Sequence, residues 1–163
     1  MPAEVATALH SFVVVAFLPE RGGDVVVPEE FGAGDWPLHV TIVPPFETAL
    51  DAEAVAARLP HGQRLPIVAG ARASFGHRRT VPVTLIRPSP ALLALHEACV
   101  EALEADGAVI ADQRHIRAGY RPHASDQRTC ALAPGDHVSL SELAIVEGAP
   151  GSRRRVAARI PLT

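Results

Sequence analysis

The chain contains no lysine, and all 15 of its basic residues are arginine. Reactions that begin on a lysine ε-amine are therefore excluded, including lysine nucleotidylation, Schiff-base formation and the phosphate contact of a P-loop lysine. The sequence also lacks the Gly-x-Ser-x-Gly turn of serine hydrolases and the Gly-x-Gly-x-x-Gly fingerprint of dinucleotide-binding folds. ATP-dependent RNA ligation through a lysine adduct is thus not expected.

The chain also has few cysteines and a small net charge. Cys99 and Cys130 fall in no metal-binding spacing, which predicts reduced thiols in a cytoplasmic protein. A net charge of −3 argues against broad coating of nucleic acid. The longest apolar N-terminal run, Phe12 to Leu18, is too short to span a bilayer, and no signal peptide is apparent. We expect one domain, residues 1–163, that is monomeric and not bound to membranes.

The most informative stretch is Pro37 to Phe46, in which Leu38, Val40 and Ile42 alternate with His39, Thr41 and Val43. Such alternation with β-branched residues predicts a half-buried strand, which we expect Pro44-Pro45 to end. Residues two apart on a strand point to the same side. The pattern therefore places an imidazole and a hydroxyl next to each other on the face opposite the apolar residues.

The remaining patterns mix strands and helices. Ser89-Pro90 is typical of a helix start, and the apolar spacing predicts a helix to Ala105, with His96 on its surface. A shorter helix is predicted over 52–59. Strands are predicted over 10–18, 65–75, 81–86, 120–127, 138–146 and 155–162, with loops at 19–37 and 112–119 and a short edge strand at 25–27. This order indicates an α+β fold with antiparallel sheets.

A second triplet repeats the plan of the first. His123-Ala124-Ser125 again sets a histidine and a hydroxyl two residues apart, 84 residues after His39. A single His-x-Ser/Thr triplet is weak evidence, because short patterns recur by chance. Two copies, each on a predicted strand and each next to proline, are more specific and hint at a duplicated half-fold.

With Leu38-His39-Val40-Thr41-Ile42 and Arg121-Pro122-His123-Ala124-Ser125, the chain resembles the 2H phosphoesterase superfamily. That family includes bacterial 2′-5′ RNA ligase and cyclic phosphodiesterase proteins. The resemblance implies two lobes of antiparallel sheet with a few flanking helices, related by a pseudo-two-fold axis around a central cleft. It also implies a phosphoesterase that opens 2′,3′-cyclic phosphodiesters of nucleotides or RNA ends.

This chemistry suits the residues. Two histidines can serve as general base and general acid near neutral pH, and we favour His123 as the base. Thr41 and Ser125 can donate to the phosphoryl oxygens, and Arg121 can add a guanidinium, so neither a metal nor a cofactor is required. Aromatic side chains that can contact a base are Phe46, Phe12, Tyr120 and Trp36.

One residue departs from the family pattern. Asp126 follows Ser125 where an apolar residue is usual, and a buried carboxylate without a partner would be costly. We expect either that the strand ends at Ser125 or that Asp126 meets an arginine such as Arg128 or Arg117.

Three other interpretations remain open at this stage. The same fold can bind a nucleotide or another phosphorylated ligand without turning it over. The histidines can ligate a metal in a hydrolase, although neither triplet supplies a third ligand. Finally, both triplets can be purely structural.

Overall fold

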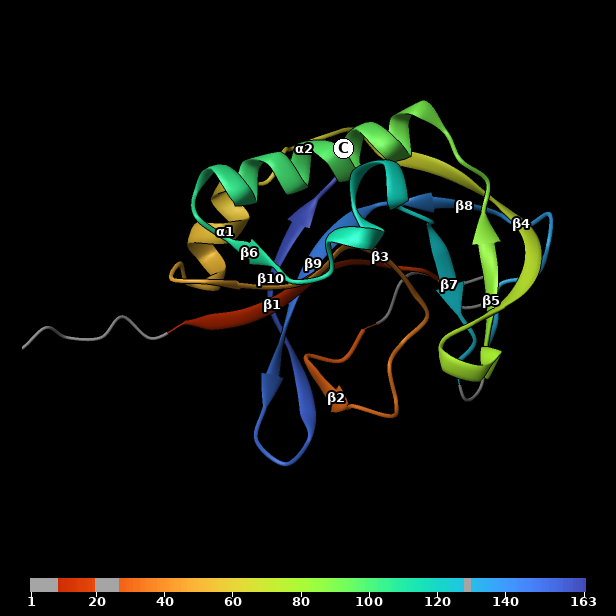
Figure 1. Ribbon diagram of the computed structural model, residues 1–163, viewed down its shortest axis with the longest axis horizontal. Coiled ribbons are helices and arrows are strands. Elements are labelled where there is room, and N and C mark those ends of the chain that lie inside the picture. The colour runs from red at the N-terminus through yellow and green to blue at the C-terminus, as the bar shows by residue number, and fades with distance from the viewer. Residues whose placement is uncertain (1–8, 20–26, 128–129) are drawn as a thin grey trace, which may run out of the picture.

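The computed structural model describes residues 9–19, 27–127 and 130–163. Figure 1 shows a mixed α+β arrangement in which two helices lie together over one part of the molecule and a group of strands lies to the side. The strands are β1 (His10–Phe17), β2 (Glu30–Gly32), β3 (His39–Thr48), β4 (Leu65–Phe75), β5 (Val81–Ile86), β6 (Val109–Ile110), β7 (His123–Ser125), β8 (His137–Leu140), β9 (Glu142–Ala149) and β10 (Arg153–Pro161). The helices are α1 (Ala52–Arg58) and α2 (Pro90–Ala105), with 3-10 turns η1 (His77–Arg79), η2 (Gln113–His115) and η3 (Arg117–Gly119).

The strands form two antiparallel sheets, which confirms the predicted fold class. The larger sheet has the order β2-β10-β9-β1-β3-β6, and the smaller has the order β7-β5-β4-β8. The first histidine motif lies on β3 of the larger sheet, and the second lies on β7 at the edge of the smaller sheet. Strands β3 and β7 contact each other, so the fold brings together motifs that are 84 residues apart in the sequence.

Strand β3 does not end at Pro44-Pro45, contrary to the sequence prediction, and continues to Thr48. Its pairing with β1 shifts register, because Val14 faces Val43 whereas Phe12 faces Phe46. A bulge of this kind leaves residues outside the hydrogen-bonded ladder, where the missing proline N–H costs nothing. The two prolines therefore bend the strand without ending it.

The two helices begin where capping residues predict. The Ser89 hydroxyl accepts the Leu92 N–H at 3.2 Å, with Pro90 at the first helical position. The Asp51 carboxylate likewise accepts the Ala54 N–H at 2.8 Å at the start of α1. Both helices pack on the larger sheet, α1 against β10 and α2 against β3.

The second motif strand is shorter than the predicted 120–127. Only His123–Ser125 pairs with β5, and the approach to it is the irregular turn η3. Pro122 has no N–H to offer a ladder, although its carbonyl accepts the Ile86 N–H at 2.9 Å. The predicted edge strand at 25–27 lies mostly outside the described residues, and β2 pairs with β10 in the predicted loop 19–37.

The main core lies between the larger sheet, the helices and the smaller sheet, and it includes Phe12, Val40, Ile42, Phe46 and Ala124. Phe12 and Phe46 are only 2% and 1% exposed. The expectation that either ring contacts a nucleobase is therefore wrong, because neither ring has a face open to a ligand. Both are core residues at the bulge between β1 and β3.

Two smaller findings concern the rest of the chain. Cys99 and Cys130 are not joined in a disulfide, as their spacing predicts. No helix among the described residues is long and apolar enough to cross a membrane.

We predict that Phe46→Ala lowers the free energy of unfolding by about 3–5 kcal/mol, because it leaves a cavity in the main core. Urea denaturation followed by circular dichroism measures this. The control is Val109→Ala, whose side chain is 65% exposed and whose loss should change stability by less than about 0.5 kcal/mol. Equal stability of the two variants would contradict this account of the core.

Candidate active site

His39 is the first residue of β3, and its ring is held in one orientation. Its Nδ1 lies 2.8 Å from the carbonyl oxygen of Pro37, so the Nδ1–H donates to that carbonyl. This bond leaves Nε2 as the ring nitrogen available for chemistry. The ring of Trp36 lies 4.7 Å from the imidazole and that of Phe17 lies 6.2 Å away, centroid to centroid.

His123 is held in the same way. Its Nδ1 lies 2.8 Å from the carbonyl oxygen of Arg121, again two residues earlier, which leaves Nε2 available. The ring of Phe75 packs edge-on against it, with centroids 4.6 Å apart. The two motifs thus share a local arrangement in addition to their residue pattern.

The two histidines interact electrostatically. Burial lowers the pKa of His39, and the nearby imidazole of His123 lowers it further. Burial also lowers the pKa of His123, with additional contributions from Arg121 and His115. Both imidazoles are therefore neutral at pH 7 when no ligand is bound, and an anion between them would favour protonation of one.

The hydroxyl residues stand where the alternation predicts. Val40 and Ile42 are fully buried, whereas His39 and Thr41 are partly exposed on the opposite face of β3. On β7 the pattern repeats, with Ala124 buried and its neighbours His123 and Ser125 partly exposed. Each histidine therefore shares a strand face with a hydroxyl group two residues away.

Two further side chains join the motifs. The Nδ1–H of His96 on α2 donates to the Ile42 carbonyl at 2.7 Å, and its Nε2 accepts the Arg117 N–H at 2.9 Å. Tyr120 stacks on His96 with centroids 3.8 Å apart, and its hydroxyl donates to the Thr41 carbonyl at 2.8 Å. We call His96 and Tyr120 the His96–Tyr120 clamp.

The prediction that His96 lies on the helix surface is wrong, because its side chain is fully buried. A sequence signal for this burial exists. His96 is four residues after Leu92 and three before Cys99, which places it on the buried stripe of α2. The role of the ring in joining both motifs depends on tertiary contacts that this spacing does not reveal.

Comparison with known proteins places this site in a family. A family model described as the 2′-5′ RNA ligase superfamily matches residues 28–138, which include both motifs and most of the chain. The chain belongs to the 2′-5′ RNA ligase superfamily. This result confirms the resemblance to 2H phosphoesterases that the two motifs indicate.

Solved structures of the superfamily share the fold. Escherichia coli LigT in complex with 3′-AMP superimposes with a TM-score of 0.59 at 15% identity, and the match covers 96% of this chain and 99% of LigT. TT0787 of Thermus thermophilus matches with a TM-score of 0.57 at 16% identity, over 93% of this chain and 97% of the other. No curated protein matches the sequence. At these identities the structural matches establish the fold alone.

Arg121, two residues before His123, packs against the same aromatic ring as that histidine. Its guanidinium carbon lies 4.8 Å from the centroid of the Phe75 ring, which also contacts His123. Cation–π packing of this kind keeps the charge close to the imidazole while leaving its N–H donors open. No local pattern singles out Phe75, because only the pairing of β4 with β5 brings it to this position.

The departure at Asp126 is accommodated without cost to the site. Strand β7 ends at Ser125, and the Asp126 carboxylate makes two bonds of 2.5 and 2.6 Å to Arg72 on β4. This contact lowers the pKa of Asp126 below its usual value. Of the two expected arginines, Arg117 pairs with Glu104 instead, and Arg128 lies outside the described residues.

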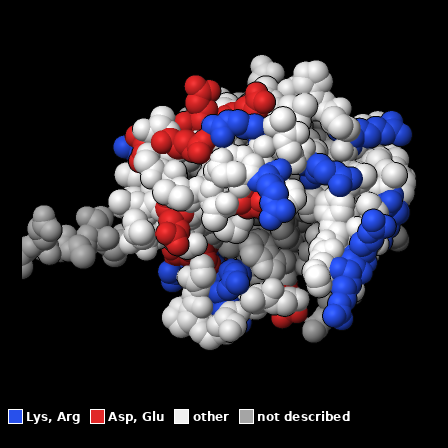
Figure 2. Space-filling view, viewed as in Figure 1, with Lys and Arg blue, Asp and Glu red and all other residues white. Residues whose placement is uncertain are grey.

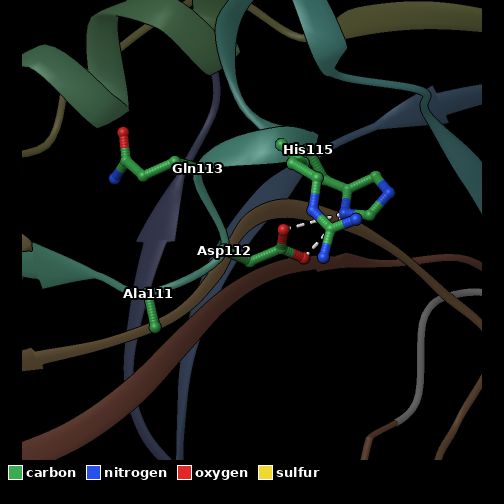
Figure 3. Close-up of a pocket in the computed structure, with 5 residues that line it drawn as sticks. Ala111, Asp112, Gln113 and His115 are labelled. Carbon is green, nitrogen blue, oxygen red and sulfur yellow. Dashed lines mark hydrogen bonds and ion pairs between the residues drawn. The ribbon is translucent and has the colours of Figure 1, made fainter.

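A hollow is lined by residues 111–115 of the loop around η2 (Figure 3). His115 and Asp112 point toward each other, with Nδ1 2.8 Å from both carboxylate oxygens, while Gln113 turns away. His115 is also the residue of this loop that lowers the pKa of His123. No group of three or more His, Cys, Asp or Glu side chains that could hold a metal ion occurs among the described residues.

We predict that His96→Ala lowers the free energy of unfolding by at least about 2 kcal/mol. The change leaves the Ile42 carbonyl and the Arg117 N–H without partners, and each such buried group costs about 1–3 kcal/mol. Urea denaturation measures the loss. His61→Ala, which removes an exposed histidine, is the control and should unfold like the parent protein. If the two variants are equally stable, the His96–Tyr120 clamp does not hold the motifs together.

We also predict that stability falls between pH 7 and pH 5. His39, His96 and His123 all have a lowered pKa in the folded protein, whereas an unfolded histidine titrates near pH 6.5. The unfolded chain therefore takes up protons first as the pH drops, and the stability present above about pH 6.5 is lost. Urea midpoints at the two pH values test this, and His96→Gln should reduce the difference. Identical midpoints in the parent protein would refute it.

Proposed function

We propose that this protein is a phosphodiesterase that opens 2′,3′-cyclic phosphodiesters of nucleotides or RNA ends by general acid–base catalysis with His39 and His123. The observation that carries the proposal is that the two imidazole rings are held in the same orientation by equivalent hydrogen bonds. Each donates Nδ1–H to a carbonyl two residues earlier, and the rings are close enough for charge on His123 to affect protonation of His39. Paired imidazoles with open Nε2 atoms suit proton transfer on both sides of one phosphorus.

The surroundings favour His123 as the base and His39 as the acid. Arg121 and His115 both disfavour a proton on His123, which keeps its Nε2 a proton acceptor. His39 instead lies against the ring of Trp36, and an aromatic face stabilises a cationic partner. Once His123 is neutral, its repulsion no longer opposes protonation of His39, and the bound phosphate anion favours that proton.

The proposed reaction requires one water molecule. Its oxygen forms a bond to phosphorus while its proton passes to Nε2 of His123. The bond from phosphorus to one ribose oxygen breaks, and Nε2 of His39 gives that oxygen a proton. Thr41 and Ser125 donate to the non-bridging oxygens, and Arg121 adds charge-assisted stabilisation. The proton that His123 gains and the proton that His39 loses are then exchanged with solvent, and no metal or cofactor takes part.

The second candidate is a protein that binds nucleotides without turning them over. Solved complexes of LigT with 3′-AMP, NADP+ and ATP show that the fold can hold such ligands in another protein. The burial that keeps both imidazoles neutral without a ligand favours this candidate, since catalysis needs one of them protonated. A hydrolysis assay together with thermal shift by 2′-AMP separates the two, because a binder is stabilised by the nucleotide but forms no product.

We predict that His39→Ala and His123→Ala each lower kcat for a 2′,3′-cyclic nucleotide by at least about a hundredfold, because each removes one proton-transfer group. Thr41→Ala and Ser125→Ala should also reduce kcat, by amounts that differ because the two donors contact different oxygens. A steady-state assay that separates the cyclic nucleotide from the ring-opened monoester gives these rates.

His61→Ala is the matched control, because it removes an exposed imidazole and should leave kcat unchanged. Circular dichroism of each variant confirms that it is folded. Near-parental rates in both His39→Ala and His123→Ala would refute the mechanism.

A further inference from the structure

The smaller sheet is the basic part of an otherwise acidic chain. No aspartate or glutamate occurs between Glu53 and Glu97, although this stretch contains all of β4 and β5 and six arginines. Figure 2 shows arginine side chains gathered on the right side of the view, over the region of these strands in Figure 1. A ligand that approaches the second motif from this side therefore meets positive charge and no acidic side chain of the β4–β5 hairpin.

Several of the other described arginines are neutralised by carboxylates. Ion pairs join Arg58 to Asp106, Arg117 to Glu104, Arg153 to Glu30, Arg155 to Glu147 and Arg159 to Glu142. Among the described arginines that take part in no ion pair, Arg87 and Arg121 are the two that line one hollow. Both are exposed. Two guanidinium groups with all their charge uncompensated attract an anion more strongly than paired ones do.

Arg87 and Arg121 line the same hollow. Its volume is about 250 Å³, and its walls also include Gly70, Leu85 and Tyr120. A Cβ on Gly70 would approach the Leu85 carbonyl to 3.3 Å and Cγ of Arg87 to 3.5 Å. The absence of a side chain at Gly70 therefore lets the Arg87 stem lie directly over β4 and leaves the hollow open.

The hollow adjoins the second catalytic motif. Leu85 is the register partner of His123, so their side chains lie on the same face of the smaller sheet. Arg87 comes two residues later, roughly 7 Å further along the chain. Arg121 forms the link, because its guanidinium packs on Phe75, whose ring contacts His123. A group bound in the hollow would thus lie two residues along the chain from the Leu85–His123 pair, next to the proposed position of the reacting phosphorus.

We propose that this hollow is a second anion site, in which Arg87 binds a phosphate group of the substrate other than the one that reacts, while Arg121 lies between the two phosphates and can contact both. This inference rests on the proposed function and narrows its substrate class. The substrate is then a nucleotide that carries at least two phosphate groups, either a 5′-phosphorylated cyclic nucleotide or the cyclic end of an RNA chain. The two arginines can offer paired N–H donors to phosphate oxygens, and the apolar wall of Leu85 accommodates the adjoining sugar.

The test compares three substrates: adenosine 2′,3′-cyclic phosphate, its 5′-phosphorylated form, and the dinucleotide ApA with a 2′,3′-cyclic end. In the parent protein we expect the second phosphate to raise kcat/KM by about tenfold, the usual effect of a charge-assisted hydrogen bond. In Arg87→Ala the second phosphate should no longer raise kcat/KM, so that the ratio between the substrates falls to about one. The value of kcat/KM for the plain cyclic nucleotide should stay unchanged. A preference for the dinucleotide over the 5′-phosphorylated form would identify an RNA chain as the source of the phosphate.

Arg64→Ala is the matched control, since Arg64 is exposed and lies just before β4, at the end of that strand opposite Phe75. It should keep the full tenfold preference. Equal kcat/KM for all three substrates in the parent protein, or a preference that survives Arg87→Ala, would overturn the second anion site while leaving the proposed function intact. If the parent protein opens none of the three substrates, the proposed function itself fails.

Discussion

The geometry of the site depends on the His96–Tyr120 clamp. One neutral imidazole donates to the carbonyl of Ile42, next to the first motif, and accepts from the N–H of Arg117, six residues before the second histidine. The Tyr120 hydroxyl makes a second bond to the first motif strand, at the carbonyl of Thr41. These bonds add to the pairing of β7 with β5 and to the burial of Ala124 in fixing the position of β7 relative to β3.

The clamp also constrains the protonation of the protein. Because His96 both donates and accepts, a proton on Nε2 would remove the acceptor that holds Arg117, and burial already lowers its pKa. His39 and His123 are likewise biased to the neutral form. Burial therefore keeps both histidines neutral, whereas an acid–base pair requires one of them to be protonated. In the proposed mechanism, a substrate phosphate would supply the missing electrostatic stabilisation and so couple activation to binding.

Local patterns in the sequence predict much of this structure because they reflect local physics. The strands 65–75 and 81–86 and the helix that starts after Ser89 have the predicted bounds, since alternation and capping act within a few residues. The errors arise where distant contacts decide. A bulge in the pairing of β1 with β3 accommodates Pro44-Pro45 within the strand. The rings of Phe12 and Phe46 pack against each other in the core. His96 forms buried hydrogen bonds across the molecule. The pairing of Arg72 with Asp126 bridges 54 residues, so no local pattern could reveal it.

Charge is divided between the lobes in a way that bears on specificity. Glu104 of α2 pairs with Arg117, and Glu142 and Glu147 of β9 pair with arginines of β10, whereas the stretch between Glu53 and Glu97 that holds β4 and β5 brings six arginines and no acids. The one carboxylate that pairs with this hairpin, Asp126, neutralises Arg72 on the face away from the histidines. Arg121 and Arg87, which take part in no ion pair among the described residues, lie on the histidine side and line one hollow. An acid–base pair alone would not discriminate among cyclic phosphodiesters. In the proposed function, the unpaired arginines beside the second motif are the groups that can select substrates with additional negative charge.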